Sequence, residues 1–136
     1  MADTIRKVGY FYSTTPDQPG SGASALAALR ERGVNLLAFH GFPEAGGAQL
    51  DFVPENEKKF LDAADEAGIE LSDRKTVFLI EGADRPGACA EVLQKLADAK
   101  INVTAMDAVA AGGRYGALLW VKPGDVDKAG KALGAR

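Results

Sequence analysis

The chain has 136 residues and a net charge of -3, without a block of lysines or arginines that would favour nucleic acid or an anionic membrane as a partner. Its apolar fraction of 46% and charged fraction of 26% are those of an ordinary globular protein, and no apolar run is long enough to span a bilayer. One cysteine excludes an internal disulfide and a cysteine-based metal cluster. The N-terminal residues show no secretory pattern, so we expect a cytoplasmic protein. We also expect the protein to carry no metal or cofactor.

A stretch near the N-terminus recurs 67 positions later. Between segments 17–35 and 84–102, seven of nineteen positions are identical, where composition alone predicts about one match. A repeat of this kind predicts two related domains, which we place at residues 1–71 and 72–136. The identical pairs are Asp17/Asp84, Pro19/Pro86, Gly20/Gly87, Ala23/Ala90, Leu26/Leu93, Leu29/Leu96 and Asn35/Asn102.

Hydrophobic periodicity and turn residues predict the elements of the first copy. In chain order these are a strand at 8–12, a helix ended by Gly33, strands at 34–39 and 49–53 around Gly46-Gly47, a helix ended by Gly68 and a short strand at 69–71. The matched alanines and leucines of the repeat, at three-residue spacing, predict the buried stripe of the first helix. The second helix is expected to bury Phe60, Ala64 and Ala67.

The second copy follows the same order and ends differently. Its expected elements are a strand at 76–80, a helix with Lys100 at its end, strands at 101–106 and 115–121 around Gly112-Gly113, and a helix burying Val126, Ala129, Gly130 and Leu133. Three residues follow Leu133, so the fourth strand is expected to be short or missing. The fold class is α+β, with two ferredoxin-like βαββαβ units in tandem, antiparallel sheets and the helices on one face.

Each copy joins an aspartate, a Pro-Gly turn and the start of a helix. The exposed glycine backbone and the unpaired N–H groups of a helix start suit the carboxylate of a small ligand. An aspartate, or an asparagine oxygen eighteen positions on, can accept from an ammonium group, so an α-amino acid is the expected ligand. The candidate contacts are Asp17, Gly20, Ser21 and Asn35 in the first copy and Asp84, Arg85, Gly87, Ala88 and Asn102 in the second; none is expected to be catalytic.

A structural interpretation stays open beside each of these functional ones. Asp17 and Asp84 also fit as simple helix caps, and the two asparagines as residues that close a turn. Cys89 aligns with a glycine and is expected to pack as a small apolar residue. His40 has no second histidine or nucleophile beside it in the sequence, which disfavours metal binding and catalysis. Asp51 interrupts an apolar strand and is expected to face solvent or a partner.

At the turn residues the chain resembles the ACT domain family, which carries D-x-P-G before its first helix and a G-I-N-like run at its second strand. The likeness covers nearly the whole chain twice. It is specific at 84–93 and 100–103 and looser in the first copy, where Pro16 precedes the turn and Ser21-Gly22 follows it. The resemblance implies regulatory domains, often attached to metabolic enzymes or transcription regulators, that bind amino acids at interfaces between paired units. The chain looks like the stand-alone tandem members of the family.

The expected function is therefore a non-enzymatic regulatory module that binds a small ligand, with the second copy as the better site. A homodimer is expected, because the uncovered sheet face and edges of two such units would expose apolar surface. One alternative is an interaction module that has lost its ligand. Another is a small ferredoxin-like enzyme, which the lack of a nucleophile and base pair disfavours. RNA binding is disfavoured because the aromatic strand motif is absent.

Overall fold

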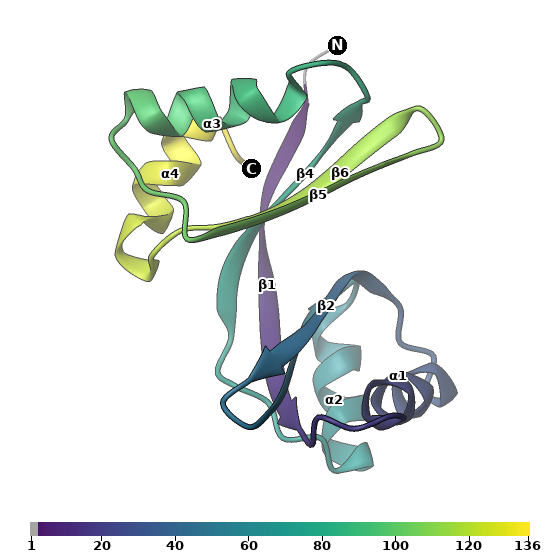
Figure 1. Ribbon diagram of the computed structural model, residues 1–136. Helices are drawn as coiled ribbons and strands as arrows, with labels where there is room; N and C mark the ends of the chain where they lie inside the picture. Colours follow the sequence, from purple (N-terminus) through teal and green to yellow (C-terminus); the bar gives the residue numbers. More distant parts are fainter. Residues whose placement is uncertain (1–2) are drawn as a thin grey trace. The chain divides into compact units, whose positions relative to one another are not determined.

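The computed structural model describes residues 3–136, which form two compact units. The first-repeat unit is Gly9–Lys75, and the second-repeat unit joins the chain up to Val8 to Thr76–Arg136. Figure 1 shows both units and labels most of their helices and strands. In chain order these are β1 (Thr4–Thr15), α1 (Ser21–Glu31), β2 (Leu36–Glu44), β3 (Gly47–Pro54), α2 (Glu57–Ala67), β4 (Lys75–Ala83), α3 (Ala88–Asp98), β5 (Ala105–Ala111), β6 (Arg114–Trp120), the 3-10 turn η1 (Pro123–Asp125) and α4 (Val126–Leu133).

The strands are hydrogen-bonded in the order β2-β3-β1-β4-β6-β5, which makes one antiparallel six-stranded sheet. In the first-repeat unit β3 pairs with β1 on one side and with β2 on the other. In the second-repeat unit β6 lies between β4 and β5 in the same way. The α+β, ferredoxin-like arrangement expected from the sequence is confirmed.

The missing last strand of the second copy is replaced by the start of β1. The N-terminal part of β1, up to Val8, belongs to the second-repeat unit, where β4 is its neighbour. The final residue, Arg136, donates its N–H to the carbonyl of Ile5 at 3.0 Å and accepts from the N–H of Lys7 at 2.9 Å. The C-terminal residues thus add two backbone hydrogen bonds without forming a strand.

The short strand expected at 69–71 is not assigned as a strand in the structure. Instead the chain makes its contact one residue later, where the N–H of Ser72 donates to the carbonyl of Tyr12 at 2.8 Å. The Ser72 hydroxyl accepts from the N–H of Tyr12 at 3.0 Å. This pair of bonds fixes the segment between α2 and β4 against β1.

The buried face of the first helix in each copy differs from the expected stripe. In α3, Leu96 is buried as expected, but Ala90 and Leu93 are exposed. Ala88 and Val92 are buried in their place, because the face toward the sheet follows a four-residue rather than a three-residue spacing. The corresponding set in α1 is Ala25, Leu26 and the buried Leu29, with Ala23 exposed.

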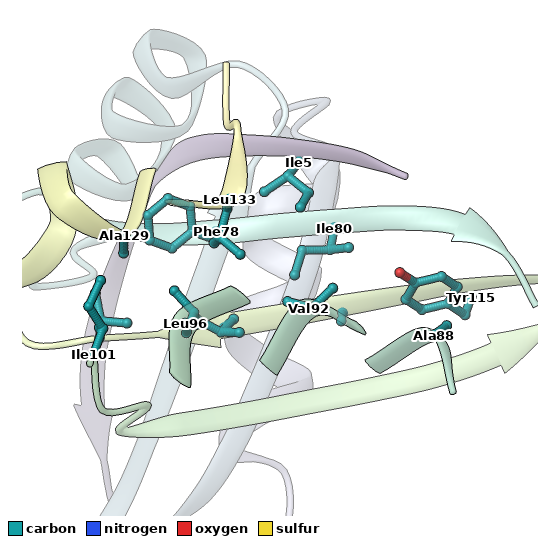
Figure 2. Close-up of a cluster of buried hydrophobic side chains, with 13 residues drawn as sticks. Ile5, Phe78, Ile80, Ala88, Val92, Leu96, Ile101, Tyr115, Ala129 and Leu133 are labelled. Atoms are coloured by element: carbon teal, nitrogen blue, oxygen red, sulfur yellow. The ribbon is translucent and has the colours of Figure 1, made fainter. Parts of the chain in front are cut away.

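Each unit has its own apolar core between its sheet and its two helices. In the first-repeat unit the rings of Phe11, Phe52 and Phe60 pack at centroid distances of 5.4 to 5.5 Å. In the second-repeat unit the start of β1 together with β4, β6, α3 and α4 contributes most of the apolar cluster of Figure 2, which includes the rings of Phe78 and Tyr115. Of the core positions expected in α2 and α4, Ala67 and Val126 are only half-buried, and the others are buried: Phe60, Ala64, Ala129, Gly130 and Leu133.

Candidate functional site

The two Asp-Pro-Gly turns lead from β1 into α1 and from β4 into α3. Gly20 and Gly87 occupy the N-cap positions with φ of 93° and 81°, where a residue with a Cβ would be strained, and no side chain caps either helix. In the second copy the turn is closed by its backbone, since Ala88 N–H donates to the Arg85 carbonyl at 3.3 Å. The interpretation of Asp17 and Asp84 as helix caps is therefore wrong.

A pocket of about 280 Å³ opens at the turn of the second copy. Its walls are the turn, the first residues of α3, residues 108–110 of β5 and the ring of Tyr115. Four of the candidate contacts, Asp84, Arg85, Gly87 and Ala88, line this one pocket, and Cys89 lies beside them. Cys89 is half-buried and packs on the adjoining apolar core, as expected of a small apolar residue.

Asn102 does not join that pocket. It follows the C-terminal end of α3, whereas the turn precedes the N-terminal end, and the 11 residues of that helix span about 16 Å. Asn102 is exposed and precedes β5, which begins at Ala105 rather than at the expected residue 101. A small ligand at the Asp84 turn therefore does not reach Asn102 of the same unit.

Arg85 is bound within the protein. Its guanidinium forms a bidentate ion pair with Asp3, at 3.0 and 3.2 Å, and donates to Glu91 at 2.7 Å. The Asp3 side chain is 10% exposed, and the hydrogen bonds from Arg85 hold the pKa of its carboxyl below the usual value against the opposing effect of burial. The hydrogen bonds to Asp3 and Glu91 likewise raise the pKa of Arg85. The arginine therefore fixes the turn in place.

Tyr115 and Gly82 complete this cluster around Asp3. The Tyr115 hydroxyl donates to Asp3 at 2.8 Å, and burial, followed by this hydrogen bond, raises the pKa of the phenol. A Cβ at position 82 would overlap the Asp3 carboxyl group, so a larger residue there would displace Asp3 from its present position. Sequence reasoning missed Asp3 and Tyr115 because they lie 82 and 112 residues from their partners in the chain.

The turn of the first copy has a different surrounding. Asp17 and Gly20 are exposed. Ser21 lines a pocket of about 430 Å³ between β1, α1 and the end of α2, and neither Asp17 nor Gly20 is part of its lining. Asn35 lies beyond the other end of α1, where its side-chain amide donates to Glu55 at 3.2 Å. Its carbonyl accepts from the N–H of Glu55 at 3.0 Å. Asn35 thus connects the approach to β2 with the approach to α2.

Asp51 is buried, and the expectation that it faces solvent is wrong. It is 5% exposed, and the side-chain amide of Gln49 donates to it at 2.9 Å. In register its neighbours across β1 and β2 are Tyr12 and His40. Within the described residues no group of histidine, cysteine and carboxylate side chains has the arrangement of a metal site. None of the described helices is long and apolar enough to cross a membrane.

No protein-family model and no curated sequence matches this chain. Solved structures do: protein BT0572 from Bacteroides thetaiotaomicron superposes with a TM-score of 0.83 at 18% identity, over 96% of this chain and 88% of that one. The ligand-free regulatory subunit of aspartate kinase from Thermus thermophilus gives 0.66 at 17%, covering 98% and 95%. The corresponding subunit from Thermus flavus gives 0.62 at 20%, covering 98% and 94%. The fold implied by the ACT resemblance is confirmed.

Proposed function

We propose that this protein is a non-catalytic regulatory module whose effector is an amino acid and whose target is a metabolic enzyme or a transcription regulator. The observation that carries the proposal is the fold, which two regulatory subunits of aspartate kinase share over nearly the whole chain. The pocket at the Asp84 turn supports it, because a carboxylate and an uncapped helix start meet there.

In this proposal the effector carboxylate accepts from the free N–H groups in the first turn of α3, at Cys89 and Ala90. The ammonium group lies against the carboxylate of Asp84. Arg85 is a positioning residue, because its donors are taken by Asp3 and Glu91. Binding stabilises one arrangement of the paired units, and that preference is what the regulated partner detects.

A homodimer fits the exposed surface. β5 is an edge strand, and its Val109 is 70% exposed. The other edge strand, β2, exposes Leu37 and Phe39 at 38% each. Edges with apolar side chains favour pairing with another chain. In such a dimer the Asn102 side chain of the partner copy would lie at the Asp84 turn, which the chain's own Asn102 does not reach. Sedimentation velocity at micromolar concentration measures the oligomeric state directly.

The alternative of an interaction module without a ligand rests on the Arg85 cluster, because charges that pair within the protein need no effector. Thermal unfolding with each proteinogenic amino acid at millimolar concentration separates the two functions. An effector that binds only the folded protein raises the midpoint.

We expect Asp84→Ala to reduce that rise, because it removes the carboxylate that faces the ammonium group at this turn. Asp73→Ala, which removes an exposed aspartate that lines neither the pocket at the Asp84 turn nor the pocket beside Ser21, is the control and should keep the full rise. If no amino acid shifts the midpoint of the wild-type protein, the interaction module is correct and the effector proposal fails.

A further inference from the structure

One place in the fold is filled with apolar side chains in the second copy. There Ile80 of β4 and Ala88 and Val92 of α3 are 0%, 6% and 2% exposed and pack against one another (Figure 2). These three residues close the space between the strand and the start of the helix, where they form part of the apolar core.

The matching place in the first copy is hollow. At the repeat offset of 67, the residues that correspond to Ile80, Ala88 and Val92 are Ser13, Ser21 and Ala25. Ser13 and Ala25 are smaller than their counterparts, and Ser13 and Ser21 each carry a hydroxyl group. All three line the pocket of about 430 Å³. That volume lies within the range of about 300–1,000 Å³ typical of small-molecule sites. The polar lining argues against a simple packing defect.

Ser13 gives the pocket a polar group that the described protein leaves without a partner. It is 8% exposed, and its hydroxyl makes no hydrogen bond with another residue among those described. In the sheet it lies opposite Leu50, which also lines the pocket. Among the described residues no side-chain nitrogen or oxygen is both shielded from solvent and unpartnered, so solvent reaches this hydroxyl from the pocket, and a bound polar ligand would take the place of water there.

Two helix ends of opposite polarity meet at this pocket. The first turn of α1, with Ser21 and Ser24, and the last residue of α2, Ala67, both line it. A helix start carries a partial positive charge and a helix end a partial negative one. Glu70 adds a carboxylate to the side of α2, and the lining includes no lysine or arginine. This polarity suits a molecule with both a carboxylate and an ammonium group, and disfavours a phosphate.

We propose that the first-repeat pocket is a binding site for a small zwitterionic amino acid, contained within one unit and separate from both Asp-Pro-Gly turns. The ligand carboxylate faces the start of α1, the ammonium faces Glu70 and the end of α2, and the Ser13 hydroxyl bonds to the buried part of the ligand. The inference rests on the proposed effector function and assigns to the effector a second site, in the first copy, and a size class.

The test is calorimetric titration of the full chain with glycine, L-alanine, L-serine and L-threonine. Ethanolamine and 3-hydroxypropanoate, which are L-serine without its carboxylate or without its ammonium, measure the need for both charges. Ser13→Ile fills the pocket with the side chain that stands at position 80 of the second copy. Ser21→Ala removes a hydroxyl group from the lining and introduces the residue that stands at position 88. Glu70→Gln removes the rim charge from an exposed position, and Asp84→Ala tests the competing turn.

At least one of the four amino acids should bind the wild-type protein, and both single-charge analogues should bind at least about tenfold more weakly. Asp84→Ala, which removes the turn site of the second copy, should still bind. In that variant Ser13→Ile should abolish the remaining binding, and Ser21→Ala and Glu70→Gln should each weaken it about three- to tenfold. If Ser13→Ile does not fold, judged by its circular dichroism spectrum, the other two variants decide the question.

Retained binding in Ser21→Ala and Glu70→Gln, together with loss in Asp84→Ala, would overturn the inference and leave the effector function standing at the second-copy turn. Binding of a large amino acid alone, dependent on Asp84, has the same meaning. If no proteinogenic amino acid binds or shifts the wild-type protein, both the inference and the proposed function fail.

Discussion

The two copies of the repeat differ at the turn before their first helix and in the space beneath the start of that helix. In the second, the turn is fixed by Arg85, Asp3 and Glu91, and the space beneath the helix start is filled around Ile80. In the first, Gln18 and Ser24 stand at the positions of Arg85 and Glu91, so the ion pairs have no counterpart, and the same space is a pocket. One sequence motif thus supports a rigid turn in one copy and a cavity in the other.

Exchanging the residues at positions 13 and 80 tests this difference most severely. Ile80→Ser should lower the free energy of unfolding by about 3–5 kcal/mol, because it leaves a cavity and a buried hydroxyl in a packed core. Ser13→Ile should change it by less than about 1.5 kcal/mol, because the added side chain enters an existing pocket. Urea unfolding of both variants gives the two values.

Equal losses in the two variants would mean that the first-copy pocket is as tightly packed as the second-copy core, and would remove the distinction between the copies.

The ion-pair cluster of Asp3, Arg85 and Glu91 should make the stability of the second-repeat unit depend on pH. The folded-state pKa of Asp3 is lowered, so the cluster contributes stability above the unfolded value, near 3.9, and loses that contribution as the pH falls through the lower folded value. Asp3→Asn should therefore cost about 1–3 kcal/mol at pH 7 and much less at pH 2. Urea midpoints of both proteins across this range measure the effect.

Glu57 supplies an internal reference for that measurement. Its pKa is also lowered, by the hydrogen bonds from Arg74, in the first-repeat unit. Asp3→Asn should therefore remove only part of the acid sensitivity. A constant difference between wild type and variant at every pH would show that Asp3 acts through its shape and not through its charge.

The sequence predicted the parts of the fold that depend on local pattern. Strands, helices and glycine turns came from periodicity within about ten residues, and the repeat indicated two similar units. The shared β1 and the Asp3–Arg85 pair depend on contacts between segments distant in the chain, which no local pattern encodes. The first-copy pocket was open to prediction, because aligning Ser13 with Ile80 sets a hydroxyl against a core residue.

The candidate site was predicted in part for the same reason. The turn residues of the second copy are close in sequence and line one pocket. Asn102 is equally close in sequence to the far end of α3, and a rigid helix separates it from the turn. A motif that spans a helix therefore predicts residues at both of its ends, and says nothing of whether they share a ligand.

The smallest expected effect lies where the helices end. Gly33 ends the first helix with φ of 72°, and Lys100 takes the matching place with φ of 59°, a conformation unfavourable for a residue with a Cβ. Lys100→Gly should raise the free energy of unfolding by about 0.5–1 kcal/mol, since the relief of strain exceeds the entropy lost on folding. Gly33→Lys should lower it by a similar amount. Thermal and urea unfolding of the two variants measure opposite shifts if the helix ends are equivalent, and a stabilising Gly33→Lys would show that they are not.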